Sequence, residues 1–166
     1  MKYLKPLSHG SKLAVLSPSS ALAHYFPGIF DMGLKNLKQL GFQIVEYPTA
    51  RMTREALYEH PEWRAKDIND AFGDPTIDGI ICAIGGYESV RILPYLDTKR
   101  ILQNPKMIMG YSDSTTFLTY LNTLGLITLH GPSVMAGFAQ LQHLGKQFGK
   151  HIEDILFHRT IPYTYT

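Results

Sequence analysis

The sequence predicts a doubly wound α/β fold with a mainly parallel, five-stranded sheet and helices on both of its faces. Short apolar segments bounded by Gly, Pro or Ser recur along the chain, as is typical of parallel strands buried on both sides. Between these segments, apolar residues recur at helical spacing. Alternation of strand and helix in this way indicates parallel strands joined by right-handed crossovers.

The expected elements follow one another without internal repeats or low-complexity segments. Five segments are predicted to be strands: 13–16, 42–45, 79–84, 107–109 and 126–129. Three apolar stripes predict helices that cover the sheet: Phe30, Leu34 and Leu37; Ala65, Ile68 and Phe72; and Phe117, Leu121 and Leu124.

Residues that favour helix ends flank these stripes. Pro61 and Glu62 suit a first helical turn, where the missing N–H of proline costs nothing and the helix dipole favours an acid. Gly41 and Gly125 each follow a leucine and can take the left-handed conformation that ends a helix. The predicted helix ends therefore agree with the apolar stripes.

The composition limits the class of protein. With 166 residues, 45% of them hydrophobic and 18% charged, the chain resembles one globular domain, for which roughly 100–200 residues is usual. No segment approaches the ~20 apolar residues that span a bilayer, and the N-terminus lacks the apolar core of a secretory signal. We therefore expect a cytoplasmic protein without a membrane partner. A net charge of +2, with acids and bases interspersed, argues against a nucleic-acid partner.

The segment 106–116 is the most informative part of the chain. In it an apolar strand leads through Gly-Tyr-Ser-Asp-Ser, from Gly110 to Ser114, into a helix, with small residues two positions before and two after Ser112. A sharp strand-to-helix elbow needs such small residues, and it is where an α/β hydrolase holds its nucleophile. Ser112 is thus a candidate nucleophile, although Ser114 replaces the usual second glycine. Serine also caps helix N-termini, so simple capping is the alternative interpretation.

A glycine pair, Gly85 and Gly86, follows another predicted strand and precedes a predicted helix. Without Cβ atoms in the way, backbone N–H groups here can point at an anion. In a hydrolase, the N–H groups of Gly86 and of Asp113, the residue after the nucleophile, would form an oxyanion hole. A phosphate cradle is the alternative, but the full Gly-x-Gly-x-x-Gly and Walker patterns are absent.

The carboxyl ends of parallel strands meet at one edge of a sheet, where ligands of α/β proteins bind. The informative loops are all expected at that edge: 17–20, 85–88, 111–113 and 130–132.

Other reactive side chains carry weaker signals. Cys82 is the only cysteine, so no internal disulfide is expected, and it is interpreted as a small buried hydrophobe. His130 ends a strand beside the one that carries Ser112 and can be a general base, but a supporting or core-edge role is the favoured interpretation. The other histidines lack metal-ligand spacing, so neither a metal nor a cofactor is expected. Glu88 and Asp113 can act as carboxylates in the cleft or serve only the helix dipole.

Taken together, several blocks resemble a known family. The segments 82–97, 104–106, 110–113 and 130–132, preceded by Ser-Pro-Ser-Ser at 17–20, are similar in order and spacing to the LD-carboxypeptidase family. That family includes the microcin C self-immunity proteins. The resemblance implies a serine peptidase with a Ser-Glu-His triad, in which the serine of Gly-Tyr-Ser-Asp is the nucleophile. It also implies a homodimer for the full-length protein.

The resemblance places the glutamate and histidine of the triad in a C-terminal domain, beyond this chain. We therefore expect residues 1–158 to form the N-terminal nucleophile domain and residues 159–166 to begin a linker to that second domain. The chain ends in Ile-Pro-Tyr-Thr-Tyr-Thr, which is rich in strand-favouring types and supports this expectation. Alone, the chain is expected to be inactive.

The resemblance also implies a small peptide or peptidyl-nucleotide substrate with a scissile amide bond. We expect Gly85, Tyr87, Glu88 and His130 to contact it. Many murein-cleaving members carry Arg-Gly-Gly-Tyr-Gly, whereas Ile84 precedes the glycines here. Loss of that guanidinium removes a carboxylate partner and favours the microcin-immunity branch, without excluding a murein tetrapeptide. A non-catalytic small-ligand-binding domain of the same fold is the alternative function.

Overall fold

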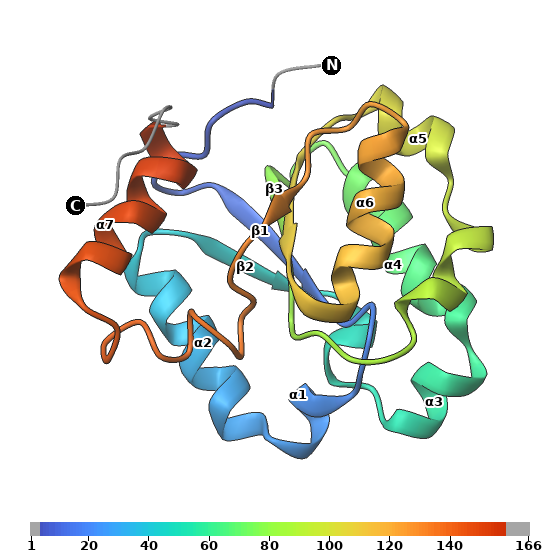
Figure 1. Ribbon diagram of the computed structural model, residues 1–166, viewed down its shortest axis with the longest axis horizontal. Coiled ribbons are helices and arrows are strands. Elements are labelled where there is room, and N and C mark those ends of the chain that lie inside the picture. The colour runs from blue at the N-terminus through green and yellow to red at the C-terminus, as the bar shows by residue number, and fades with distance from the viewer. Residues whose placement is uncertain (1–3, 159–166) are drawn as a thin grey trace.

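The computed structural model describes residues 4–158 and confirms the predicted fold class (Figure 1). Its sheet has five strands in the order β2-β1-β3-β4-β5, and every neighbouring pair is parallel. The strands are β1 (Lys12–Leu16), β2 (Gln43–Glu46), β3 (Gly79–Cys82), β4 (Met107–Gly110) and β5 (Leu129–His130).

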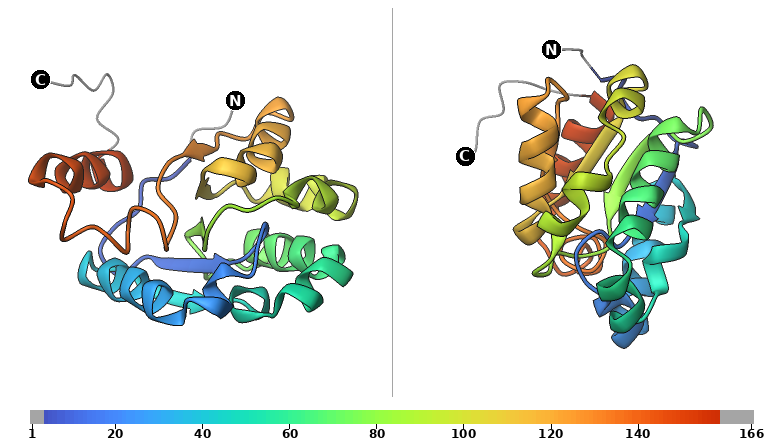
Figure 2. Two further views of the ribbon diagram at one scale, coloured as in Figure 1. Left: turned by 60° about the horizontal axis from the view of Figure 1, so that its bottom comes forward. Right: turned by 90° about the vertical axis from the view of Figure 1, so that its right-hand side faces the viewer.

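Helices connect the strands, and Figures 1 and 2 show them on both faces of the sheet. Helix α2 and helix α7 lie on one face, while α4, α5 and α6 cover the other. The helical elements in chain order are α1 (Leu22–Tyr25), α2 (Pro27–Gln39), the 3₁₀ turn η1 (Pro48–Arg51), α3 (Arg54–Glu59), α4 (Pro61–Gly73), η2 (Ser89–Tyr95), α5 (Thr98–Gln103), η3 (Ser112–Ser114), α6 (Thr115–Thr123), α7 (Lys146–Glu153) and the π-helical turn η4 (Asp154–His158).

The fifth strand differs from its prediction. Residues 126–129 were expected to form it, but β5 contains only Leu129 and His130. The residues before it close the preceding helix instead: the N–H of Leu126 donates to the carbonyl of Leu121, and the hydroxyl of Thr128 donates to that of Leu118. The apolar segment 126–128 therefore packs against the end of α6 and does not form part of a strand.

The predicted apolar stripes form the core, with one exception. Seven of their nine residues have no exposed surface and Leu34 is 4% exposed, whereas Leu124 is 38% exposed. Leu124 lies outside the stripe because α6 ends at Thr123 and the chain then turns at Gly125, whose φ is +97°. The predicted helix end at Gly41 is confirmed by its φ of +95°.

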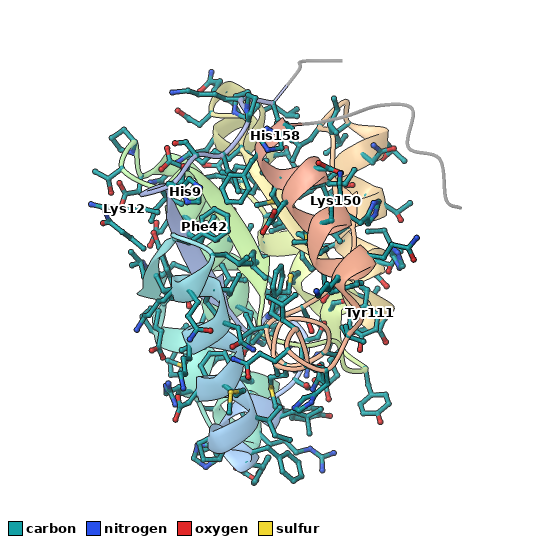
Figure 3. The ribbon with its side chains drawn as sticks, turned by 90° about the vertical axis from the view of Figure 1, so that its left-hand side faces the viewer. His9, Lys12, Phe42, Tyr111, Lys150 and His158 are labelled. Atoms are coloured by element: carbon teal, nitrogen blue, oxygen red, sulfur yellow. The ribbon has the colours of Figure 1, made fainter. Side chains whose placement is uncertain are left out.

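The last helical turn returns to the amino ends of the strands. The Leu7 N–H donates to the Leu156 carbonyl at 3.1 Å, and the Phe157 ring stacks on His9 and on Phe42. Figure 3 shows His9 and Phe42 near His158 at one end of the molecule, with Tyr111 toward the other. The predicted linker, residues 159–166, lies outside the described residues.

Among residues 4–158, no helix is both long enough and apolar enough to cross a lipid bilayer.

Cys82 provides a test of the core. Its side chain is fully buried in β3, and burial raises the pKa of the thiol to about 12. We predict that a thiol-specific disulfide reagent at about pH 8 leaves the folded protein unmodified, because the thiol is both protonated and inaccessible. After denaturation, one thiol per chain should react with the reagent. Fast labelling of the native protein would contradict this placement.

Candidate active site

The corner between β4 and α6 has a strained backbone. Among the described residues other than glycine, only Ser112 has a positive φ, at 59°. This left-handed conformation costs roughly 1–2 kcal/mol for a residue with a Cβ, and its side chain is exposed at the surface. Neither η3 nor α6 has a side-chain capping hydrogen bond at its N-terminus. The geometry is therefore that of the predicted elbow and not of a simple helix cap.

Small residues make the turn at Ser112 sterically feasible. A Cβ on Gly110 would lie 2.8 Å from the Cys82 sulfur and 3.2 Å from the Cβ of Ser114. Ser114 is itself fully buried, with its hydroxyl 3.3 Å from that of Ser19. Positions 110 and 114 therefore tolerate only small side chains, as the sequence predicted.

The glycine pair lies directly beside the nucleophile candidate. A Cβ on Gly85 would come within 2.8 Å of the Ser112 Cβ and 3.0 Å of its Oγ, and one on Gly86 would meet Ser20 at 2.7 Å. The loops after β1, β3 and β4 are thus in contact at one edge of the sheet. Within residues 4–158, the N–H groups of Gly86 and Asp113 have no protein acceptor. Both are free for a ligand, and their joint role as oxyanion donors stays a prediction.

The Asp113 side chain ties the two loops together. One of its carboxylate oxygens, Oδ2, accepts hydrogen bonds from the backbone N–H groups of Glu88 and Ser89, each at 2.9 Å. The fully buried Ser89 hydroxyl donates in return to the Asp113 carbonyl at 2.5 Å. Sequence reasoning considered this carboxylate only as a helix-dipole or cleft residue. Its observed role is to fix the glycine loop to the elbow.

Arg64 is a further site residue that the sequence analysis missed. Its side chain is 1% exposed, and its Nη1 donates to the carbonyls of Pro18 at 3.2 Å and Glu88 at 3.4 Å. Burial is the main cause of a lowered pKa for this guanidinium. The available signal was its position four residues before Ile68, in line with an apolar stripe, where a charged residue is unexpected.

The residues predicted to contact the substrate lie in different places relative to Ser112. Tyr87 and Glu88 follow the glycine pair, and Tyr87 is 92% exposed at the loop tip. His130 is paired in register with Gly110 and lines an apolar cavity of about 530 Å³ between β5 and α7. That cavity does not include Ser112. Among the described residues, the Ser112 hydroxyl has no hydrogen-bond partner, so no base contacts it there.

A metal centre has no set of ligands in this part of the chain. Between residues 4 and 158, no group of three His, Cys, Asp or Glu side chains is placed to hold an ion.

A parallel α/β sheet whose fourth strand leads into a strained, exposed serine defines an α/β domain with a strand-to-helix elbow. Residues 13–131 match the family model described as the LD-carboxypeptidase N-terminal domain. Because the match covers most of the chain, the protein belongs to the LD-carboxypeptidase family, as the sequence blocks predicted.

Individual relatives carry related names. A candidate carboxypeptidase of Vibrio cholerae serotype O1 is 35% identical over 171 residues, covering 100% of this chain and 50% of that protein. The microcin C7 self-immunity protein MccF of Escherichia coli is 34% identical over 137 residues, covering 81% of this chain and 40% of its own length. The murein tetrapeptide carboxypeptidase of Pseudomonas aeruginosa is 32% identical over 126 residues, covering 73% and 39%.

Solved structures agree with these relationships. A tryptophan-to-phenylalanine variant of MccF in complex with adenosine monophosphate, and MccF in complex with aspartyl sulfamoyl adenosine, each superpose with a TM-score of 0.87 at 31% identity over 98% of this chain. The aligned part is 49% of the MccF chain. The chain therefore spans about half the length of the relatives it matches.

The strain at Ser112 can be measured through stability. We predict that Ser112→Gly unfolds at higher denaturant concentration than Ser112→Ala, by about 1 kcal/mol in the free energy of unfolding. Glycine takes a positive φ without a Cβ clash, whereas alanine retains the strain and also loses the hydroxyl. Equal stability of the two variants, or a more stable alanine variant, would mean that the corner is relaxed in solution.

The Asp113 contacts can be tested separately. Asp113→Ala leaves two N–H groups without an acceptor, which should cost about 1–3 kcal/mol in the free energy of unfolding. It should also speed hydrogen exchange at the amides of Glu88 and Ser89. Asp113→Asn keeps a carbonyl oxygen and should restore part of both effects. Exchange rates at these two amides that are the same in all three proteins would argue against the contact.

Proposed function

We propose that this chain is the nucleophile half of a serine-type peptidase or amidase that hydrolyses an amide bond through Ser112. The observation that carries the proposal is the exposed, unpartnered hydroxyl of Ser112 on a backbone with φ of 59°. Strain of this kind persists only where the surrounding structure imposes it, and it is concentrated at active sites. The carboxypeptidase names of several relatives support the same reaction class.

In the proposed reaction, the Ser112 oxygen attacks the amide carbonyl while a base takes its proton. The resulting oxyanion accepts hydrogen bonds from the N–H groups of Gly86 and Asp113, which are preorganised donors. Collapse expels the amine, which takes up the proton held by the base, and leaves an acyl-enzyme. Attack by water then releases the acid and restores the serine.

The proposed base comes from outside the described residues, since none of them forms a hydrogen bond with the Ser112 hydroxyl. We propose that a glutamate and a histidine of a C-terminal domain supply it, with residues 1–158 as the nucleophile domain and residues 159–166 as the start of the linker. The half-length coverage of the relatives supports this arrangement. A homodimer and a cytoplasmic location are proposed with it, from the family resemblance and the sequence.

For the substrate, we propose a murein peptide or a peptidyl-nucleotide of the microcin C type, contacted by Gly85, Tyr87, Glu88 and His130. Ile84, which is half-buried, stands where many murein-cleaving members have arginine, and this favours the peptidyl-nucleotide. Assaying the protein with its C-terminal half on both substrates separates the two branches. A covalent adduct at Ser112, detected by mass spectrometry, separates either enzyme from a non-catalytic binding domain.

The nucleophile assignment predicts a large loss of turnover. In the protein that includes the C-terminal half, Ser112→Ala should lower kcat by about 10³-fold or more, since the acyl-enzyme can no longer form. Circular dichroism and the denaturation midpoint serve as controls for the fold. Wild-type turnover by this variant would falsify the assignment.

A base supplied from outside this chain, as proposed, leads to a second prediction. The 166-residue chain alone should fold cooperatively but hydrolyse neither substrate at a measurable rate, because an unassisted serine hydroxyl is a weak nucleophile. If the short chain is active after all, the same assay on its His130→Ala variant tests whether His130 is the base. Activity in the short chain that disappears in the His130 variant would place the base within it.

A further inference from the structure

A second cavity, of about 250 Å³, is lined in part by Ser19 and Ser20, which border Gly86 of the glycine pair beside Ser112. It opens between the loop that follows β1, represented by Ser20, and the loop that follows β3, represented by Tyr87. The chain leaves β1 toward β2 on one side and leaves β3 toward β4 on the other. Such a topological switch point creates the crevice in which doubly wound sheets bind ligands. The position alone therefore makes this cavity a candidate ligand site.

The cavity is lined by two guanidinium groups that the protein does not fully use. Arg64 forms part of the wall, and its Nε and Nη2 are buried without a hydrogen-bond partner among the described residues. Leaving buried donors unpaired is unfavourable. Arg54 also lines the cavity, is exposed, and has no hydrogen bond or ion pair to another described residue. Both arginines are thus available to act on an anion.

Glu88 is the one acid among the described residues that line the cavity, and it is largely engaged elsewhere. The carboxylate of Glu88 pairs with Arg91 at 3.1 Å, outside the cavity, and lies 3.8 Å from Nη2 of Arg64. The lining therefore carries two positive charges and one negative charge, which suits a monoanion better than a phosphate dianion. The planar fork of arginine matches a carboxylate in shape.

The rest of the wall sets the size of the ligand. Leu22 and Leu57 contribute apolar surface, and the volume admits a group the size of a small amino-acid residue. The glycine pair separates the cavity from Ser112, since Gly85 borders the serine and Gly86 borders Ser20. The cavity and Ser112 therefore border the two neighbouring residues of one loop, an arrangement in which a single small molecule can contact both.

We propose that this cavity is a subsite for a free carboxylate of the substrate, with Arg54 making the direct contact and Arg64 supplying charge from the wall. As a statement about substrate, it rests on the proposed amide hydrolysis at Ser112. As a binding site, it can be tested without any turnover.

The test is a titration of the ¹⁵N-labelled chain followed by NMR, with N-acetyl-D-alanine and its uncharged carboxamide as the probes. The acid should bind at least about tenfold more tightly than the amide, with shifts at Ser20 and Tyr87. Arg54→Met should abolish that preference and Arg54→Lys should restore part of it. Arg100→Met, which removes an exposed arginine paired with Asp70, is the matched control and should bind like the wild type.

Three results would overturn the proposal: equal affinity for acid and amide, an unchanged preference in Arg54→Met, or inorganic phosphate binding more tightly than the acid. In the protein with its C-terminal half, Arg54→Met should raise KM about tenfold with kcat nearly unchanged, for substrates with a free carboxylate only. A positive titration beside an active Ser112→Ala variant would refute the proposed function and leave the subsite standing. Loss of turnover in Ser112→Ala with a negative titration would do the reverse.

Discussion

The left-handed backbone at Ser112 is the constraint on which the rest of the site depends. It costs free energy and persists because neighbouring groups leave no alternative: Gly110 and Ser114 leave room for the turn, and Gly85 packs against the serine without a side chain. The buried Cys82 side chain packs against the backbone of Gly110. Packing in the core thereby stabilises the left-handed conformation that keeps the Ser112 hydroxyl exposed to solvent.

The loops around this corner are held by side chains from other elements. Asp113 binds the N–H groups of Glu88 and Ser89, Arg64 from α4 binds the carbonyls of both the first and the third strand loops, and Ser20 donates to the Gly85 carbonyl at 2.7 Å. Each contact joins segments that are distant in the sequence. Preorganised donors are effective in catalysis because they need not rearrange during the reaction, and this network provides that rigidity.

Local patterns were sufficient for most of the fold. Apolar runs and helical stripes identified four strands closely and the core faces of three helices, because buried strands and amphipathic helices carry their periodicity in adjacent residues. The fifth strand was misplaced, since Leu126 is as apolar as a strand residue yet closes a helix. The elbow was visible as a short motif. Arg64 and the carboxylate of Asp113 were not, because their partners are set by tertiary contacts.

The glycine loop separates the residues that hold its backbone from those that face outward. Its conformation is fixed by Ser20, Asp113 and Arg64, none of which belongs to the loop, while Tyr87 at its tip is 92% exposed. A change at position 87 would remove few contacts within the domain, so mutation can sample new side chains there at little cost in stability. In evolutionary terms, if Tyr87 contacts the substrate as proposed, substrate preference can drift at the loop tip while the backbone around Ser112 stays intact.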